Sequence, residues 1–486
     1  MKRVTLNTTS FLLLLLALSQ SAMAQCFPTQ PKTAAFATGG TSKNKNQVLW
    51  LTWGSTLANV ATYPYGRHNQ PLANGSASYA SIDVGGGRFL CVQAVISGIT
   101  GSDIKSYAPG NYSGDSMDDM YNIGGTGTNN KLVSGIRNGT DGGLATFTVT
   151  CTATLNGVPV KLSGMVIGDA ESLAASEFFN ATADGKWNIV ELQKNLNNTN
   201  PYQIRKVNVI PGTQQRIEFV KGNDDNTAAV SFLTFNQTAY AATTFDVSFS
   251  VTLKGGGLTA IALGLLPPGV DGGDAPASYG SPLHMIDALA ISSDGIAPTT
   301  AVGTPTNLNT SSYTPGALIP PTSDYLGTTG PDMDTGPLFS NDAMGDNNNG
   351  SAGVNEEDAW PTKYKSFSYK ANYMPGNIIS AVIPYKGSED AYISGWIDFN
   401  QNGIFDDNER VTVAAPANQT SVTLSWTVPY SRVIKSTYVR LRYAKNQSDL
   451  LSPTSATPGG EVEDHRIYIQ GPVITNPMLP SKAKKN

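Results

Sequence analysis

The sequence predicts an all-β protein of two β-sandwich domains, and three observations support this. The 486 residues include 49 Gly and 29 Pro but only 14% charged residues, which favours turns and short strands over helices. Short runs of alternating apolar and polar residues recur along the chain. A long acidic stretch rich in Gly, Pro, Asn and Ser separates two such regions, at residues 271–358. We expect a jelly-roll or lectin-like sandwich before this stretch and an immunoglobulin-like sandwich after it.

The N-terminus reads as a secretory signal peptide at residues 1–24. Lys2 and Arg3 precede an apolar run, and Ala22-Met23-Ala24 gives the A-x-A pattern of a cleavage site. We therefore expect a secreted or cell-surface protein. No later run approaches the ~20 apolar residues that cross a bilayer, so no transmembrane segment is expected. The net charge of -5, without clustered Lys and Arg, argues against nucleic acid as a partner.

The first domain is expected at residues 25–268, ending at Pro267-Pro268. Its clearest strand is 147–155, where Phe147, Val149 and Cys151 alternate with threonines. The segment 171–179 is predicted as a short helix or ordered loop. Further strands are expected at 47–53, 89–96, 161–167, 204–210, 216–220, 229–235 and 245–254.

The second domain is expected at residues 269–470, followed by a flexible basic tail at 471–486. Val422, Leu424 and Trp426 alternate with polar residues, which indicates a half-buried strand. Strands are expected at 377–384, 391–399, 410–414, 421–428, 437–443 and 461–469.

The cysteines Cys26, Cys91 and Cys151 all lie in the first third of the chain. An exported protein can form one disulfide among them and leave one thiol, and the sequence does not choose the pairing. Cys151 is expected to point inward, because it lies on the apolar face of its strand.

The segment from Asp398 to Glu409 matches the calcium-loop pattern D-x-[DN]-x-[DN]-G-x5-E. Strand-like residues flank it, so it predicts a loop on a β-hairpin and not an EF-hand. We expect structural Ca²⁺, with oxygen ligands from Asp398, Asn400, Asn402, Glu409 and, through water, Asp406. The alternative is a polar hairpin turn with solvated acids.

Two of the last predicted strands each carry two like-charged residues at alternate positions. Glu461 and Glu463 share one face of one strand, and Arg440 and Arg442 share one face of another. We expect bidentate ion pairs between these arginines and glutamates, in preference to direct metal binding by the glutamates.

These motifs together resemble a known family. The segments 273–280, 325–327, 355–358, 396–400 and 460–464 occur in the order of the GEVED domain of bacterial surface proteins. The region before them, with Trp50-Leu51-Thr52-Trp53-Gly54, resembles the non-repetitive lectin-like sandwich of CshA/CshB-type fibrillar adhesins. The resemblance implies an exported adhesin whose first domain binds a host or matrix protein or a glycan.

Three features depart from the resemblance. Asp271-Gly272-Gly273-Asp274 lacks the aromatic residue common in the family, and His465 stands where a tyrosine usually follows the Glu-Val-Glu-Asp motif. The chain has no Leu-Pro-x-Thr-Gly motif. Fibril formation and sortase attachment are therefore not expected.

Ligand binding by the first domain would use exposed aromatic side chains on loops. The first candidates are Tyr63, Tyr65, Arg67 and His68. A second set comprises Tyr107, Tyr112, Tyr121 and the loop from Asp115 to Asp119. Core packing of these tyrosines is the alternative.

The chain is not expected to be an enzyme. No G-x-S-x-G, His-Glu-x-x-His or Walker pattern occurs, and the three histidines lie far apart. Two alternatives to the adhesin remain, namely a secreted carbohydrate-active hydrolase with paired carboxylates and a cell-envelope protein with a purely structural role. No oligomeric state is predicted.

Overall fold

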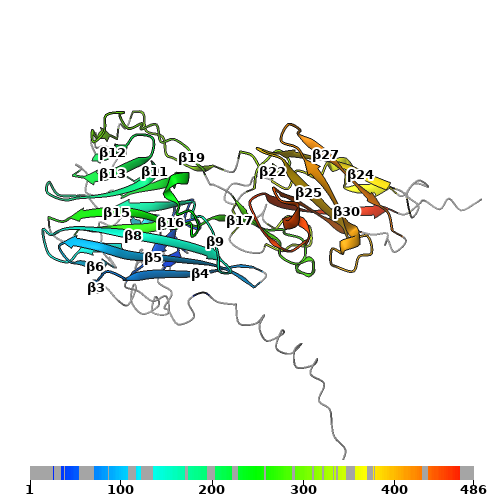
Figure 1. Ribbon diagram of the computed structural model, residues 1–486, viewed down its shortest axis with the longest axis horizontal. Coiled ribbons are helices and arrows are strands. Elements are labelled where there is room, and N and C mark those ends of the chain that lie inside the picture. The colour runs from blue at the N-terminus through cyan, green and yellow to red at the C-terminus, as the bar shows by residue number, and fades with distance from the viewer. Residues whose placement is uncertain are drawn as a thin grey trace, which may run out of the picture. The chain divides into compact units, whose positions relative to one another are not determined.

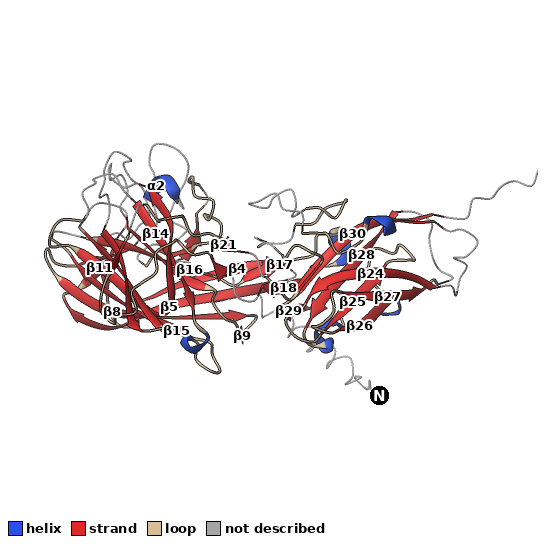
Figure 2. Ribbon diagram, turned by 90° about the horizontal axis from the view of Figure 1, so that it is seen from above, coloured by secondary structure: helices blue, strands red, loops and turns tan. Residues whose placement is uncertain are grey.

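The computed structural model confirms the all-β fold class. It describes residues 26, 34–37, 39–53, 70–85, 87–107, 117–121, 135–169, 173–193, 203–221, 228–256, 259–286, 290–308, 311–319, 322–331, 333–334, 338–345, 356–368, 376, 378–429 and 436–470. Figure 2 shows that strands dominate, and α2 (Met117–Met120) is the single α-helical turn in these ranges. No helix in the described part of the chain is long and apolar enough to span a membrane.

Unit 1 comprises residues 1–268 and 288–319. Its larger sheet is antiparallel, and several of its strands lie side by side in Figure 1. Its strands, in spatial order, are β4 (Ala77–Gly85), β5 (Arg88–Gly101), β8 (Leu144–Leu155), β15 (Val247–Lys254), β11 (Phe178–Gln193), β13 (Gln214–Val220), β12 (Gln203–Ile210) and β20 (Thr306–Asn307), with β9 (Val158–Pro159) also pairing with β8.

The second sheet of unit 1 contains the strand predicted around Trp50. In spatial order it runs β1 (Ala34–Phe36), β2 (Leu49–Leu51), β16 (Ala260–Leu266), β10 (Gly164–Asp169), β14 (Ala228–Phe235) and β11. A short ladder of β3 (Pro71–Leu72), β6 (Ile104–Tyr107) and β7 (Gly135–Asn138) continues from β16.

The long strand β11 belongs to both sheets. Residues 178–184 pair with β13 and β15, whereas residues 185–193 pair with β14 in the second sheet. The helix or loop predicted at 171–179 is wrong at its C-terminal end, since β11 begins at Phe178 and Phe179, Ala181 and Ala183 are buried in alternation. This alternation of buried residues is that of a β-strand, and β11 starts shortly after the turn at residues 175–176.

The alternation predicted along β8 is confirmed. Phe147, Val149, Cys151 and Ala153 are buried, while the threonines between them are partly exposed. The exposed face carries cross-strand hydroxyl pairs, such as Thr150 Oγ1 to Ser248 Oγ at 2.9 Å. This face pattern is what a half-buried strand requires.

The predicted domain boundary near residue 268 needs one correction. Residues 288–319 were expected in the second domain, but they pack within unit 1. The carboxylate of Asp294 is the main reason, because it forms a buried ion pair with Lys206 Nζ at 2.6 Å and accepts the Ile189 amide at 2.7 Å. The segment also contains β20 and the hairpin of β19 (Ala290–Ile291) with β21 (Leu318–Ile319).

Unit 2 comprises residues 269–287 and 320–486, and it is a second sandwich. One sheet is β23 (Ser366–Ser368), β30 (Glu461–Gln470), β28 (Ser436–Ala444), β25 (Ala391–Ile397) and β26 (Arg410–Ala415). The other is β22 (Tyr325–Leu326), β24 (Ile378–Lys386) and β27 (Ser421–Thr427), and a small sheet adds β17 (Gly269–Asp271), β18 (Leu283–Ile286) and β29 (Ala456–Pro458). Side chains of both larger sheets, including Ile383, Trp426 and Leu441, form its core.

The cysteines follow the predicted count of one disulfide and one thiol. Cys26 is bonded to Cys91, with 5.5 Å between their Cα atoms, and Cys151 is a buried thiol. Burial raises the pKa of the Cys151 thiol. The bridge ties the start of the described chain to the exposed face of β5.

We predict that the number of reactive thiols in the unreduced protein differs between the folded and the denatured state. The folded chain should show no reactive thiol, because Cys151 is buried and the reactive species is a thiolate. The chain in denaturant should show one thiol per molecule by Ellman titration. Three thiols in denaturant would contradict the disulfide. The control is a Cys151→Ala variant, which should show no thiol in denaturant.

Candidate functional site

The loop from Asp398 to Glu409 connects β25 to β26. The two strands pair antiparallel, with Trp396 opposite Arg410, so the loop closes a β-hairpin as predicted. Gly403 has φ +86°, a conformation that favours glycine and allows the sharp turn. The chain returns through a short 3₁₀ turn at Asp407–Glu409.

Asp398 is the buried residue at the centre of this loop. Its Oδ2 accepts hydrogen bonds from the Tyr279 hydroxyl at 2.7 Å and from the Gly403 amide at 3.1 Å. Its Oδ1 is buried and has no hydrogen-bond partner among the described residues. A buried carboxylate oxygen without a partner is costly, so Asp398 has an oxygen that would gain from a cation.

The next three predicted ligands hydrogen-bond to one another. The side-chain oxygen of Asn400 accepts the Asn402 amide at 2.8 Å, and that of Asn402 accepts the Ile404 amide at 3.0 Å. Both side-chain amides donate to Asp406 Oδ2 at 2.9 Å. These are local turns in which the carbonyl oxygens keep a second lone pair for a ligand.

Glu409, the last predicted ligand, instead caps the loop backbone. Its Oε1 accepts the Phe399 amide at 2.8 Å, its Oε2 accepts the Asp406 amide at 3.1 Å, and Asp406 completes a reciprocal capping box. Burial raises the pKa of Glu409 to about 7, and the charge of Asp398 adds to the effect. The carboxylates of Asp398, Asp406 and Glu409, all described, do not converge within 4.8 Å of one another. The loop is therefore shaped by its own hydrogen bonds.

The predicted ion pairs of Arg440 and Arg442 with Glu461 and Glu463 are wrong. In the register of β28 and β30, Arg440 lies opposite Asp464, and Leu441 lies opposite Glu463. The arginines and glutamates therefore occupy opposite faces of the sheet, because side chains alternate along a strand.

Arg440 forms its ion pair with Asp464 instead, and both side chains are fully buried. The pair is bidentate, with Nε to Oδ1 at 2.8 Å and Nη2 to Oδ2 at 2.7 Å. The guanidinium also donates to the carbonyl oxygen of Tyr279 at 2.9 Å, and Asp464 accepts the Ala275 amide at 2.9 Å. The ion pair thus holds the irregular segment around residues 275–279 against the sheet.

Arg442 contacts a buried histidine on the same face. Its Nε donates to His284 Nε2 at 2.9 Å, and the other ring nitrogen, Nδ1, lies 2.9 Å from the Gly459 carbonyl oxygen. Burial lowers the pKa of His284, and the charge of Arg442 lowers it further. His284 is therefore a neutral ring that accepts from Arg442 and donates to Gly459, which gives it a structural role.

Glu461 and Glu463 hold two further segments of the chain on the opposite face, one of them at strand β22. Glu461 Oε2 accepts the Leu326 amide, and Glu463 Oε2 accepts the Ala359 amide at 2.8 Å. On the edge of the strand, the amide of Val462 donates to Asp271 Oδ2 at 2.6 Å. Consecutive residues of one motif thus bind separate parts of the acidic stretch.

Comparison with protein families identifies both units. Residues 46–266 match the family model described as "Surface adhesin CshA non-repetitive domain 2", and residues 392–468 match the model of the GEVED domain. The chain therefore contains a domain of the CshA non-repetitive domain 2 family and a C-terminal GEVED domain. The GEVED match covers most or all of the strands from β25 to β30 and begins after the acidic stretch.

Other comparisons add little to this assignment. No curated protein matches the chain. A crystal structure of the N-terminal domain of the Streptococcus gordonii adhesin Sgo0707 is 8% identical, covers 92% of this chain and 89% of its own, and has a TM-score of 0.26. The adhesin domain of Epf from Streptococcus pyogenes is 9% identical, covers 83% and 98%, and has a TM-score of 0.14. With such scores neither structure supports a conclusion about this chain.

The ligand-binding residues predicted in the CshA-type domain lie outside the described residues. These are Tyr63, Tyr65, Arg67, His68, Tyr112 and Asp115. Of the second set, Tyr107 and Tyr121 are described, and the predicted loop at residues 115–119 becomes α2 from Met117 onward. Tyr107 is half-buried at the end of β6. Tyr121 is fully buried, with its hydroxyl 2.5 Å from Glu191 Oε2 and its ring packed edge-on against Trp50. Core packing, the alternative reading, applies to Tyr121.

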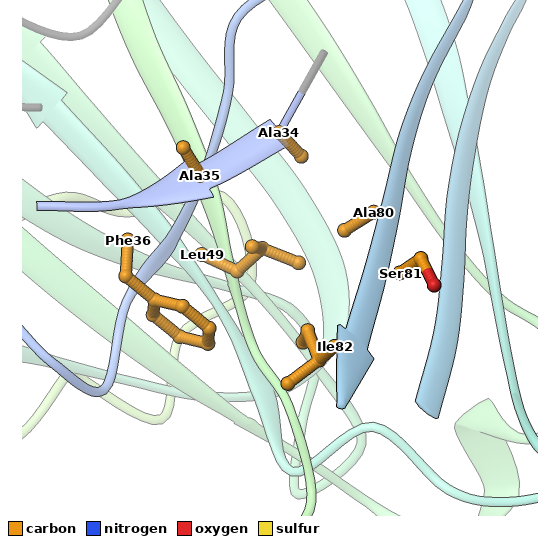
Figure 3. Close-up of a pocket in the computed structure, with 7 residues that line it drawn as sticks. All are labelled: Ala34, Ala35, Phe36, Leu49, Ala80, Ser81 and Ile82. Atoms are coloured by element: carbon orange, nitrogen blue, oxygen red, sulfur yellow. The ribbon is translucent and has the colours of Figure 1, made fainter. Parts of the chain in front are cut away.

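Sequence reasoning missed a shallow apolar pocket in the CshA-type domain. It measures about 320 Å³, and Figure 3 shows Phe36, Leu49 and Ile82 around it. Strands β1, β2 and β4 line it, the remaining residues being Ala34, Ala35, Ala80 and Ser81. No pattern in the sequence indicates it, because its residues come from three short or weakly patterned strands.

We predict that Arg440→Lys strongly destabilises the GEVED domain. Lysine cannot make the two parallel bonds to Asp464 while also donating to the Tyr279 carbonyl. The expected loss in unfolding free energy is about 3 kcal/mol, typical of breaking a buried pair. The matched control is Arg466→Lys, an exposed arginine two residues from Asp464 on the same face of β30, which should unfold like the wild type. Equal unfolding midpoints for the two variants in urea would contradict the role of the pair.

Proposed function

We propose that the protein is an exported adhesin, at the cell surface or secreted, whose CshA-type domain binds a host or matrix protein or a glycan. The observation that carries this proposal is the match of residues 46–266 to a domain of a surface adhesin. The signal-like residues 1–24 agree with export. The family matches also support a role without enzymatic activity.

In this proposal the GEVED domain is a rigid presentation module. Its acidic stretch, which has little regular structure, is held by hydrogen bonds that backbone amides in it and next to it donate to the buried carboxylates of Glu461, Glu463 and Asp464. Such bonds are stronger than neutral ones and define one geometry. A domain built this way is suited to hold an attached binding domain in place, and a metal ion would add to its stiffness.

We assign structural calcium to the loop at Asp398. The support is the spacing of its oxygen-bearing residues and the buried, unpartnered Oδ1 of Asp398. Asn400, Asn402 and Asp406 would supply further side-chain oxygen ligands. Calcium would also offset the charge of Glu409, whose burial disfavours ionisation.

The first prediction is that the purified protein binds in arrays of matrix proteins and glycans. Tyr63→Ala with Tyr65→Ala should reduce binding at least about tenfold, as expected for two aromatic anchors. Tyr468→Ala is the control, since Tyr468 is a half-exposed tyrosine of the GEVED domain. Hydrolysis of any bound glycan would contradict the adhesin proposal and favour a hydrolase. Absence of all binding would favour a structural envelope protein.

The second prediction concerns calcium. Millimolar calcium should raise the melting temperature of the GEVED domain above its value in chelator, because a ligand bound only to the folded state stabilises it by about 2.7 kcal/mol at 100 times Kd. Asp398→Asn should abolish the difference. Asp407→Asn also removes one negative charge, from an exposed position in the same loop, and this variant should keep the calcium-dependent difference in melting temperature. A wild-type melt that calcium leaves unchanged would reject the site.

A further inference from the structure

A second group of possible metal ligands lies away from the Asp398 loop. On β30, Glu461, Glu463 and His465 alternate onto the face that also carries Tyr443, Leu441 and Val439 of β28. Glu357, from the acidic stretch, reaches the same place. Ligand atoms of Glu357, Glu463 and His465 all lie within 4.8 Å of one another, and this is the single such group among the described residues.

The three side chains lie close together and are buried from solvent. His465 Nε2 lies 2.8 Å from Glu463 Oε2 and 3.7 Å from Glu357 Oε2. The exposed side-chain fractions are 6% for His465, 4% for Glu357 and 1% for Glu463. The Ala359 amide donates to Glu463 Oε2 and fixes the orientation of that carboxylate. A fixed carboxylate beside an imidazole nitrogen is a common arrangement at metal sites.

Two buried oxygens next to the group have no partner. Glu463 Oε1 and Glu461 Oε1 make no hydrogen bond within the described chain, although both residues are essentially fully buried. Neither glutamate forms an ion pair with a lysine or arginine there, and the side chain that contacts Glu463 Oε2 is the His465 ring. Native proteins rarely leave buried carboxylate oxygens in this condition unless an ion or water occupies the site.

Three carboxylates gather around these oxygens. Those of Glu357 and Glu463 lie within 4.8 Å of a His465 ring nitrogen, and Glu461 shares the β30 face of Glu463. The contact of His465 Nε2 with Glu463 Oε2 leaves Oε1 of both Glu461 and Glu463 without a partner.

We propose that Glu357, Glu463 and His465 bind a divalent transition-metal ion of the zinc type, with Glu461 beside it. The imidazole nitrogen selects this class over calcium, which takes oxygen ligands. The ion replaces the proton between His465 Nε2 and Glu463 Oε2 and supplies two positive charges to the buried acids. It also links β30 to the acidic stretch through Glu357. The site is independent of the calcium loop and of the ligand of the CshA-type domain.

The test uses the untagged full chain, stripped with chelator and titrated with Zn²⁺ in a calorimeter. One Zn²⁺ per chain is expected at this site, and excess millimolar Ca²⁺ should not displace it. His465→Gln and Glu357→Gln should each weaken binding more than about tenfold, because loss of a ligand costs at least as much as loss of an outer-shell partner. His68→Gln and Asp398→Asn are the controls and should bind like the wild type.

X-ray absorption at the zinc edge gives a readout that needs no variant to fold. The zinc-loaded wild-type chain should show an imidazole and otherwise oxygen ligands, and the imidazole signal should persist in His68→Gln. Circular dichroism confirms that each variant used is folded. The proposal is overturned by absence of zinc binding, by a spectrum without imidazole, by displacement of zinc by calcium, or by folded His465→Gln and Glu357→Gln variants that bind as tightly as the wild type.

Discussion

The second unit depends on one constraint, which is that every buried charge of the Glu461–Asp464 motif needs a partner. An isolated carboxylate loses its hydration when buried, and that loss is recovered only through hydrogen bonds or an opposite charge. Asp464 obtains both, from the Ala275 amide and from Arg440. Glu461 and Glu463 obtain one backbone amide each, from Leu326 and Ala359.

The same hydrogen bonds explain how the parts of the acidic stretch that belong to unit 2 are held, although their described strands are short. Its composition alone is that of a linker, because it has too few apolar residues to form a core. Its backbone amides nevertheless need acceptors, and the motif supplies them from both faces of one strand. The motif and the stretch are therefore mutually dependent, and the carboxylates act as acceptors for backbone groups more than as partners for the arginines.

Much of the strand layout could be predicted from sequence, since it depends on local alternation. Strands β8, β24, β25, β27 and β28 begin and end within a few residues of their expected limits. The register between β28 and β30 could not be predicted. Both Arg440 and Leu441 are fully buried, so burial on both faces removes the polar–apolar contrast that normally specifies a register.

Contacts between residues far apart in the chain could not be predicted from the sequence either. Asp294 places residues 288–319 in unit 1 through Lys206, which lies 88 residues away in the chain and follows no local pattern. At the Asp398 loop the pattern correctly placed the loop on a β-hairpin. It did not show that Glu409 would turn to the loop backbone, because that depends on which amides the folded loop leaves unsatisfied.

The most direct test of the account is hydrogen exchange at the amides that the motif is said to hold. Glu463→Ala should speed exchange of the Ala359 amide at least about tenfold while sparing that of Ala275, since a hydrogen bond to a charged group contributes about 1.5–3 kcal/mol. Asp464→Ala should do the reverse. Unchanged protection of both amides in both variants, measured under native conditions, would contradict the claim that the motif orders the acidic stretch.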